Sequence, residues 1–193
     1  GRQDETWKFM AALGRLGGPT WFRLGDSDLA LHLERTRRLA AGETLSAVTD
    51  GLRRKLGVVS RILPMTDDRV RTRLRCDCGW LDFQDYFVRL RCEPAVQALD
   101  YVGAEAARPV PEVIDMLGGE DLRAVVICPS NPFLSIEPIL AIPGMRTAIA
   151  NCRAPVVAVS PVIAGQAVKG PTTKMMRELG LAASASAVAC RYA

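Results

Sequence analysis

Two short apolar runs constrain the fold of this chain more than any other feature. Residues 124–128 (Ala-Val-Val-Ile-Cys) and 155–160 (Pro-Val-Val-Ala-Val-Ser) have the length of strands and are apolar almost throughout. Such runs are typical of parallel strands that are covered on both faces, because neither face then has to be polar. Helices are expected over Gly144–Asn151 and Pro171–Leu179. This order predicts an α/β fold of the doubly wound type, with a three-layer, Rossmann-like parallel sheet.

The first ninety residues have a different character. Between Val70 and Cys92 the residues alternate in polarity, which predicts an added antiparallel β-hairpin that turns at Asp77-Cys78-Gly79 and continues from Trp80 through Val88. Before the hairpin, apolar residues recur at helical spacing in three segments. These predicted helices span Asp4–Leu16, Asp26–Gly42 and Thr44–Leu56, the last capped by Thr44 or Glu43.

Composition limits the function classes. The 193 residues are 49% hydrophobic and 24% charged, which suits one globular domain over residues 1–193. No apolar stretch approaches the roughly 18 residues of a membrane span, so no membrane partner is expected. The net charge of +4 is spread along the chain, which favours a small anionic substrate over nucleic acid. Six cysteines are expected to be reduced thiols, since a domain of this size needs no disulfides.

The ends of the sequence add two expectations. The chain begins with Gly1 and shows no charged leader followed by an apolar segment, so we expect a cytoplasmic protein. The missing initiator Met and the final Arg191-Tyr192-Ala193 predict that the domain is truncated at both ends.

Candidate ligand-binding residues follow the two apolar runs, because ligands of open parallel sheets bind beyond the carboxyl ends of the strands. After the first run, Ser130, Asn131 and Ser135 offer donors for phosphate oxygens, although small polar residues there are equally ordinary turn caps. After the second run, Lys169 stands just before a helix, where a cation suits a phosphate. We favour phosphate binding by these two loops over a solvated lysine in a flexible loop.

Paired carboxylates supply the candidate metal ligands. Asp67 and Asp68 follow a probable strand and could hold Mg²⁺ while it bridges phosphate oxygens, although such pairs are common in plain turns. Asp26 and Asp28 have the same ambiguity, because either can cap the helix that follows.

Several other classes of site lack their motifs. Cys76 and Cys78 have no second cysteine pair at zinc spacing, and His32 is the single histidine, so a structural zinc site is not expected. Neither a Gly-x-Ser-x-Gly elbow nor a Walker A motif occurs. The chain also lacks the Gly-x-Gly-x-x-Gly turn, which counts against a nucleotide-binding oxidoreductase.

Five segments in order resemble the 2-phospho-L-lactate transferase family, and the match spans nearly the whole chain. They are Leu24-Gly25-Asp26-Ser27-Asp28-Leu29, Leu63-Pro64-Met65-Thr66-Asp67-Asp68, Phe83-Gln84-Asp85-Tyr86-Phe87, Pro129-Ser130-Asn131-Pro132 with Ser135-Ile136, and Val159-Ser160-Pro161. The opening Asp4-Glu5-Thr6-Trp7 also looks like this family.

The resemblance implies a magnesium-dependent, cytoplasmic, homodimeric enzyme of coenzyme F-420 biosynthesis. Such an enzyme moves a phospholactyl, phosphoenolpyruvyl or phosphoglyceryl group from a guanosine-diphosphate anhydride to the ribityl hydroxyl of 7,8-didemethyl-8-hydroxy-5-deazariboflavin, releasing GMP. On this reading, Asp67 and Asp68 are the catalytic and metal-binding candidates. The substrate-binding candidates are Ser130, Asn131, Ser135, Lys169, Asp26 and Trp7, the last by stacking on the deazaflavin.

Two departures from the family separate this chain from a complete member. The family's glycine-rich opening strand and a following acidic segment would precede Gly1, so we expect the 193 residues alone to be inactive. The family usually has Lys or Arg where this chain has Ser27. The alternative function is a nucleotide-binding or nucleotide-sugar-binding regulatory protein of the same fold class, which would bind a nucleotide without transferring anything.

Overall fold

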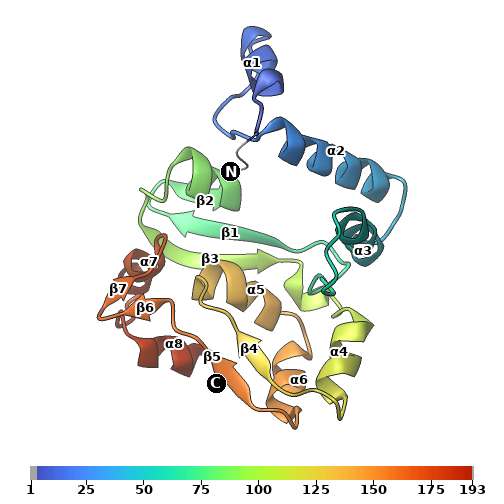
Figure 1. Ribbon diagram of the computed structural model, residues 1–193. Helices are drawn as coiled ribbons and strands as arrows, with labels where there is room; N and C mark the ends of the chain where they lie inside the picture. The colour runs from blue at the N-terminus through green and yellow to red at the C-terminus, as the bar shows by residue number, and fades with distance from the viewer. Residues whose placement is uncertain (1–3, 193) are drawn as a thin grey trace. The chain divides into compact units, whose positions relative to one another are not determined.

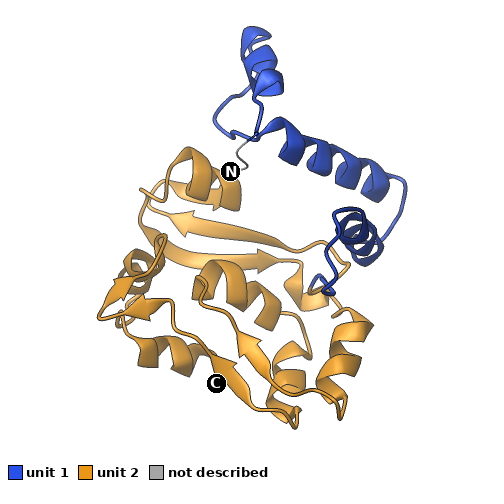
Figure 2. Ribbon diagram, viewed as in Figure 1, with its two compact units in different colours: residues 1–64 blue, residues 65–193 orange. Residues whose placement is uncertain are grey.

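The computed structural model describes residues 4–192 and divides into two compact units, residues 1–64 and 65–193 (Figure 2). The prediction of a single domain over residues 1–193 stays a prediction. Each unit has its own helices, and the sheets all belong to the second unit (Figure 1).

The N-terminal unit carries helices α1 (Lys8–Arg15), α2 (Asp26–Ala40) and α3 (Leu45–Lys55), each inside a predicted range. Helix α3 begins where the Thr44 hydroxyl accepts a hydrogen bond from the Ala47 N–H at 3.2 Å, which confirms the predicted cap. Helix α2 places acidic residues in its first turn and Arg37 and Arg38 in its last, as the helix dipole favours.

The second unit opens with a three-stranded antiparallel sheet in the order β2-β1-β3 (Figure 1). Strands β1 (Arg71–Cys76) and β2 (Gly79–Asp82) form the predicted hairpin, and the turn lies where it was expected. Strand β3 (Val96–Val102) pairs with the other edge of β1 and was not predicted.

The predicted continuation of the hairpin from Trp80 through Val88 is wrong after Asp82. The chain instead forms η1 (Asp85–Arg89), a π-helical turn. The reason is the spacing of Phe83, Tyr86 and Phe87, three and four residues apart, which places their side chains on one side of a helical turn and buries Tyr86 completely.

Strands β4 (Val125–Ile127) and β5 (Val156–Ala158) form the predicted parallel pair, with Val125 opposite Val156. The expectation that both strands are buried is wrong, since Val126 is 56% exposed and Val157 is 50% exposed. Residues 4–192 therefore give an α/β fold with a two-stranded parallel pair, and do not show the three-layer Rossmann-like sheet.

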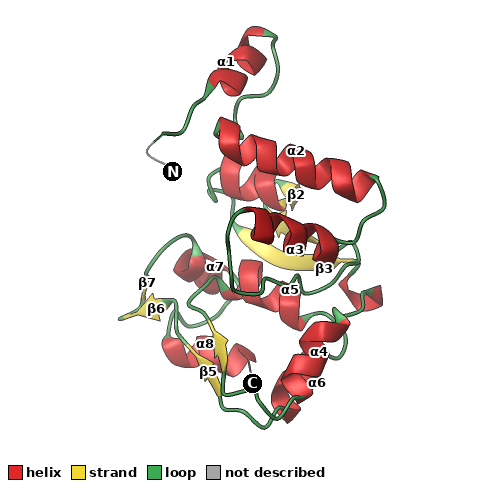
Figure 3. Ribbon diagram, turned by 45° about the vertical axis from the view of Figure 1, so that its right-hand side comes forward, coloured by secondary structure: helices red, strands yellow, loops and turns green. Residues whose placement is uncertain are grey.

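Short helices surround these strands (Figure 3). Helices α6 (Met145–Asn151) and α7 (Thr172–Glu178) confirm the two predictions made for this half, and α6 lies beside α4 (Pro111–Gly118). The remaining elements are η2 (Ala104–Ala106), η3 (Pro132–Ile136), α5 (Glu137–Leu140), the β6–β7 hairpin (Val162–Ile163 and Gln166–Ala167) and α8 (Ala185–Tyr192).

The larger core of the second unit holds the loops after β4 and β5 in place. It joins side chains of the antiparallel sheet and η1 to Phe133 of η3, Met175 and Met176 of α7 and Val188 of α8. Each fully buried side chain of this size stabilises the fold by roughly 1.5–3 kcal/mol. Phe133 is further fixed through its carbonyl oxygen, which accepts a 2.6 Å hydrogen bond from the Tyr101 hydroxyl.

Within residues 4–192, no single helix combines the length and the apolar composition that a membrane crossing requires. One pair, Pro132–Leu140 with Met145–Asn151, meets both criteria jointly but bends by 84° at the break between its helices.

Candidate functional site

The loops after β4 and β5 line one cleft of about 440 Å³ in the second unit, which we call the loop cleft. Parallel strands end at the same edge of a sheet, so the two loops were expected to meet. Four predicted substrate-binding residues line this cleft together: Ser130, Asn131, Ser135 and Lys169. Their roles in binding stay predictions, but their common location follows from the sheet.

Asn131 bonds to its own chain. Its side-chain oxygen accepts hydrogen bonds from the N–H groups of Phe133 at 2.9 Å and Leu134 at 3.0 Å, and its amide nitrogen lies 3.5 Å from the Met175 sulfur. Asn131 therefore caps η3 and fixes the course of the loop. The structure confirms the turn-cap reading of this loop, and phosphate binding by the loop stays a prediction.

The two serines of the same loop have free side chains. Neither the Ser130 nor the Ser135 hydroxyl forms a hydrogen bond with the part of the chain that the structure describes, although both residues line the loop cleft. A serine hydroxyl can donate one hydrogen bond and accept two. The capping by Asn131 thus presents two unoccupied hydroxyls to a ligand.

The loop after β5 contributes the lysine of the cleft, Lys169. Ser160 closes the first turn by accepting the Val162 N–H at 3.0 Å, and the β6–β7 hairpin then returns the chain toward the cleft. Lys169 follows this hairpin, is exposed and has no ion pair within residues 4–192. Gly170, at φ +71°, turns the backbone directly before Pro171 and α7. A free ammonium group and free hydroxyls that line one cleft suit a phosphate group.

An aromatic pair forms another wall of the loop cleft. Phe83 and Phe87 stack with their ring centroids 5.3 Å apart and their planes 22° from parallel, and Phe87 is 41% exposed. A flat apolar surface of this kind suits a planar ring system. The pair was not predicted, because the alternating sequence pattern indicated a strand for this segment, and residues four apart in a strand do not stack.

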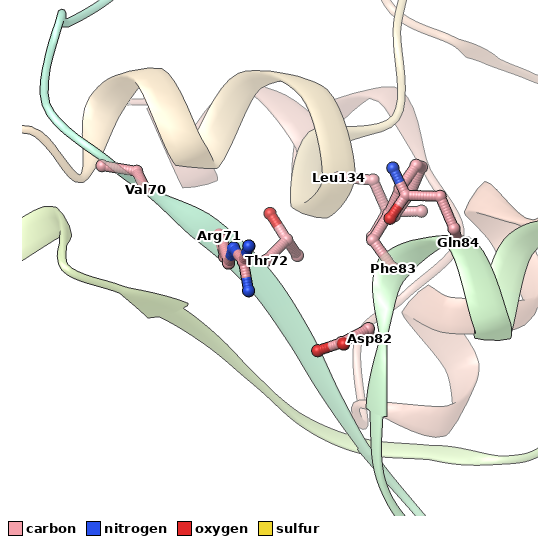
Figure 4. A pocket seen from close by; sticks show the side chains of 7 residues that line it. All are labelled: Val70, Arg71, Thr72, Asp82, Phe83, Gln84 and Leu134. Carbon is pink, nitrogen blue, oxygen red and sulfur yellow. The ribbon is translucent and has the colours of Figure 1, made fainter. Parts of the chain in front are cut away.

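A second cavity of about 420 Å³, the strand-edge cavity, adjoins the loop cleft (Figure 4). Phe83 and Leu134 line both cavities and form the wall between them. The other residues around the strand-edge cavity are Val70, Arg71, Thr72, Asp82 and Gln84. None of these five residues was predicted to be a site residue.

Asp67 and Asp68, the candidate metal ligands, line neither cavity. The Asp68 carboxylate accepts the Arg108 N–H at 2.8 Å and lies 3.9 Å from the Arg108 guanidinium nitrogen. Buried Thr66 strengthens this attachment by donating a 2.6 Å hydrogen bond to the Arg108 carbonyl. Residues 4–192 contain no cluster of three or more His, Cys, Asp or Glu side chains suited to a metal, so the two carboxylates do not by themselves form a magnesium site.

Asp26 and Trp7 lie in the N-terminal unit. The Asp26 carboxylate accepts hydrogen bonds from the Thr6 hydroxyl at 2.6 Å and from the N–H groups of Lys8 and Phe9 at 3.1 Å each. These bonds, led by that of Thr6, lower the pKa of Asp26 below its ordinary value. Trp7 is partly exposed, and the Arg23 guanidinium lies 5.0 Å from the centre of its ring.

All six cysteines are free thiols, as expected. Burial raises the pKa of Cys76 and of Cys92, so both stay protonated at neutral pH. Neither has the lowered pKa of a cysteine nucleophile.

Comparison with known proteins decides the family. The family model described as 2-phospho-L-lactate transferase CofD matches residues 5–191. The chain belongs to this family. The resemblance stated from five short segments is thereby confirmed over almost the whole chain.

Relatives with curated names support the same assignment. A phosphoenolpyruvate transferase of Kitasatospora aureofaciens is 43% identical over 197 residues, which cover 100% of this chain and 61% of that protein. The phosphoenolpyruvate transferase of Streptomyces coelicolor is 44% identical over 199 residues, with the same two coverages. That of Mycolicibacterium smegmatis is 37% identical over 195 residues, covering 97% and 59%. The chain thus spans about three fifths of the length of these relatives.

Solved structures support the fold alone. Two crystal structures of a UPF0052 family protein from Bacillus halodurans superpose with TM-scores of 0.52 and 0.50, at 16% and 15% identity. They cover 65% and 63% of this chain, and 39% and 38% of the other.

Proposed function

We propose that this chain forms the substrate-binding part of a transferase of coenzyme F-420 biosynthesis. The enzyme moves a phosphoenolpyruvyl, phospholactyl or phosphoglyceryl group from a guanosine-diphosphate anhydride to the ribityl hydroxyl of the deazaflavin alcohol. Family membership and the names of the relatives support the class of reaction. The identity of donor and acceptor belongs to the proposal.

One observation carries the proposal to this chain: free hydroxyls, a free cation and a stacked phenyl pair line the same cleft. Ser130, Ser135 and Lys169 can hold a charged phosphate, and Phe83 with Phe87 can contact a flat ring. A transferase that joins a diphosphate donor to a flat aromatic acceptor needs both kinds of surface within reach of each other.

The reaction follows from ordinary phosphoryl chemistry. The acceptor hydroxyl gives up its proton to solvent as its oxygen attacks the phosphorus of the phospho-acid, the bond from that phosphorus to the bridging oxygen breaks, and GMP leaves with the bridging oxygen. Negative charge grows on the bridging and equatorial oxygens, so catalysis depends on fixed donors and cations. In our proposal the Lys169 ammonium neutralises this charge, while Ser130 and Ser135 orient the phosphate through hydrogen bonds.

Magnesium and the aspartate pair stay part of the proposal. Mg²⁺ is commonly held by one or two carboxylates together with substrate phosphates, and it would neutralise the diphosphate charge. Asp67 and Asp68 are the candidates, for the metal or for orienting the attacking hydroxyl. The attachment of Asp68 to Arg108 argues against an assembled site, so we assign no step to the metal.

The homodimer and the cytoplasmic location are proposed on the family resemblance alone. Light scattering of the complete gene product would test the dimer: a mass of one chain would contradict it.

A mass-spectrometric transfer assay tests the reaction. The complete gene product and this 193-residue chain are each supplied with Mg²⁺, the deazaflavin alcohol and one of the three guanylyl donors. A deazaflavin product heavier by one phospho-acid, together with GMP, supports the proposal and names the donor. Nucleotide binding without product from any donor would favour the regulatory alternative. We expect the 193 residues alone to give no product.

A further inference from the structure

The strand-edge cavity exists because β2 is shorter than its partner. Strand β3 pairs with β1 along Arg71–Cys76, whereas β2 pairs only from Arg73, because the chain turns into η1 after Asp82. The second edge of β1 is therefore unpaired at Arg71 and Thr72. An unpaired edge presents backbone N–H and C=O groups, which can hydrogen-bond a ligand.

Free polar side chains surround this edge (Figure 4). In the described part of the chain, Arg71, Thr72 and Gln84 form no side-chain hydrogen bond or ion pair. The nearest cation to the Asp82 carboxylate is Arg73, at 3.5 Å, and 62% of the Asp82 side chain is exposed. Figure 4 shows the Asp82 carboxylate and the Gln84 amide directed toward the side of Arg71 and Thr72. The cavity thus offers a carboxylate, a guanidinium, an amide and a hydroxyl that lack strong partners.

These groups complement the guanine base of the proposed donor better than any part of the acceptor. Guanine presents two neighbouring N–H donors, N1–H and the 2-amino group, and these match the two oxygens of a carboxylate. Its O6 and N7 accept hydrogen bonds from an arginine fork. The pyrimidinedione edge of a deazaflavin instead flanks one N–H with two carbonyls, which a carboxylate repels. Asp82 and Arg71 together therefore favour guanine over the deazaflavin.

The position of the cavity agrees with this choice. Phe83 and Leu134 are shared with the loop cleft, where Lys169 and the two serines lie. A nucleotide that crosses this wall has its base on one side and its diphosphate on the other.

We infer that the strand-edge cavity binds the guanine base of the donor, with Asp82 accepting from N1–H and the 2-amino group and Arg71 donating to O6 and N7. This inference rests on the proposed function, since it identifies the base subsite of the proposed guanylyl donor.

Calorimetric titration of the 193-residue chain with GDP, IDP, XDP and ADP tests the inference. Xanthine has a carbonyl at position 2, so an amide complements it and a carboxylate repels it. We expect the wild type to bind GDP at least about tenfold more tightly than XDP, which corresponds to about 1.4 kcal/mol, with IDP between them. Asp82→Asn should reverse this preference.

Two further variants make the outcome specific. Arg71→Ala should weaken GDP and XDP alike, because both bases carry O6. Asp100→Asn is the matched control: Asp100 also lies opposite Arg73, on β3, but lines neither cavity, and it should leave the GDP preference unchanged.

Retention of the GDP preference by Asp82→Asn would overturn the inference. Two results with the wild type would also overturn it: equal affinity for GDP and ADP, or no binding of any guanine nucleotide. The proposed function is judged separately by the transfer assay. Transfer by the complete gene product, with no change of base preference in Asp82→Asn, would refute only the base subsite.

Discussion

The segment around Gly25-Asp26 and the loop cleft both contain motif residues of the family, but they use their polar groups differently. In the N-terminal unit, Asp26 bonds to the start of α1, and Glu5 accepts the Ser27 N–H at 3.1 Å. In the loop cleft, Ser130, Ser135 and Lys169 have no such partners within residues 4–192. A motif residue is therefore a ligand candidate only where its own chain leaves it unsatisfied.

The two motifs of the N-terminal unit pack so closely that only glycine fits at position 25 without a shift of Glu5. A Cβ placed on Gly25 would lie 2.1 Å from the Glu5 side-chain carboxyl carbon, and the Asp26 N–H donates to the Thr6 carbonyl at 2.9 Å. The segments Asp4-Glu5-Thr6-Trp7 and Leu24-Gly25-Asp26-Ser27-Asp28 are thus one structural feature. Their pairing holds α1 to the start of α2.

The largest expected effect on the transfer rate comes from removing the Lys169 ammonium group. Lys169→Ala should lower the transfer rate of the complete gene product on the order of 100-fold, because a preorganised charge on a transferring phosphate typically contributes about 3 kcal/mol. Lys169→Arg should keep part of the rate. Lys55→Ala, an exposed lysine at the end of α3, is the control. Equal rates for Lys169→Ala and wild type would exclude Lys169 from phosphate binding.

Asn131→Ala should act on stability first. It removes the acceptor for two backbone N–H groups at the start of η3, and such a cap contributes about 1–2 kcal/mol. Urea denaturation followed by circular dichroism measures the change. An unaltered midpoint would show that the loop does not depend on this side chain.

Ser130→Ala should lower phosphate affinity and leave stability unchanged. The hydroxyl has no partner among the described residues, so the urea midpoint should not move, whereas phosphate affinity should fall about fivefold for one lost hydrogen bond of roughly 1 kcal/mol. Titration of the chain with GDP measures the affinity. A loss of stability in Ser130→Ala would show that Ser130, like Asn131, holds the loop in place, and would contradict the prediction.

The smallest and most local effect is expected at Asp26. Its folded-state pKa is lowered, so its contribution to stability is complete above its unfolded pKa and is lost as the pH falls through the folded value. The protection factors of the Lys8 and Phe9 amides, which allow for the slower intrinsic exchange in acid, should therefore fall as the pH is lowered. In Asp26→Asn these protection factors should already be low at neutral pH and should show no such acid dependence.

Short-range chemistry predicted much of this structure. The positions of α2, α3 and α6, the Thr44 cap, the hairpin turn at Asp77-Cys78-Gly79 and the parallel pairing of β4 with β5 follow from spacing and turn residues. The meeting of Ser130 with Lys169 followed from the topology of a parallel sheet.

Long-range packing decided the rest. The burial of Tyr86 draws the segment after Asp82 into a helical turn, and this opens the edge of β1 that forms the strand-edge cavity. Arg71 and Asp82 acquire their common location only through that event, so no local pattern marks them. Similarly, Asp26 does not cap the helix that follows it, as one reading of the sequence had it, but bonds to Thr6 and Lys8, about twenty positions earlier in the chain.

The half-exposed valines of β4 and β5 have a practical consequence for these measurements. Val126, Val156 and Val157 place apolar side chains in solvent on a short parallel pair, and exposed apolar strands readily pair with those of other molecules. Heating this chain at the concentrations used in calorimetry should therefore end in precipitation, and the apparent melting temperature will depend on the scan rate. Dilute samples in urea are the appropriate conditions for comparing its variants.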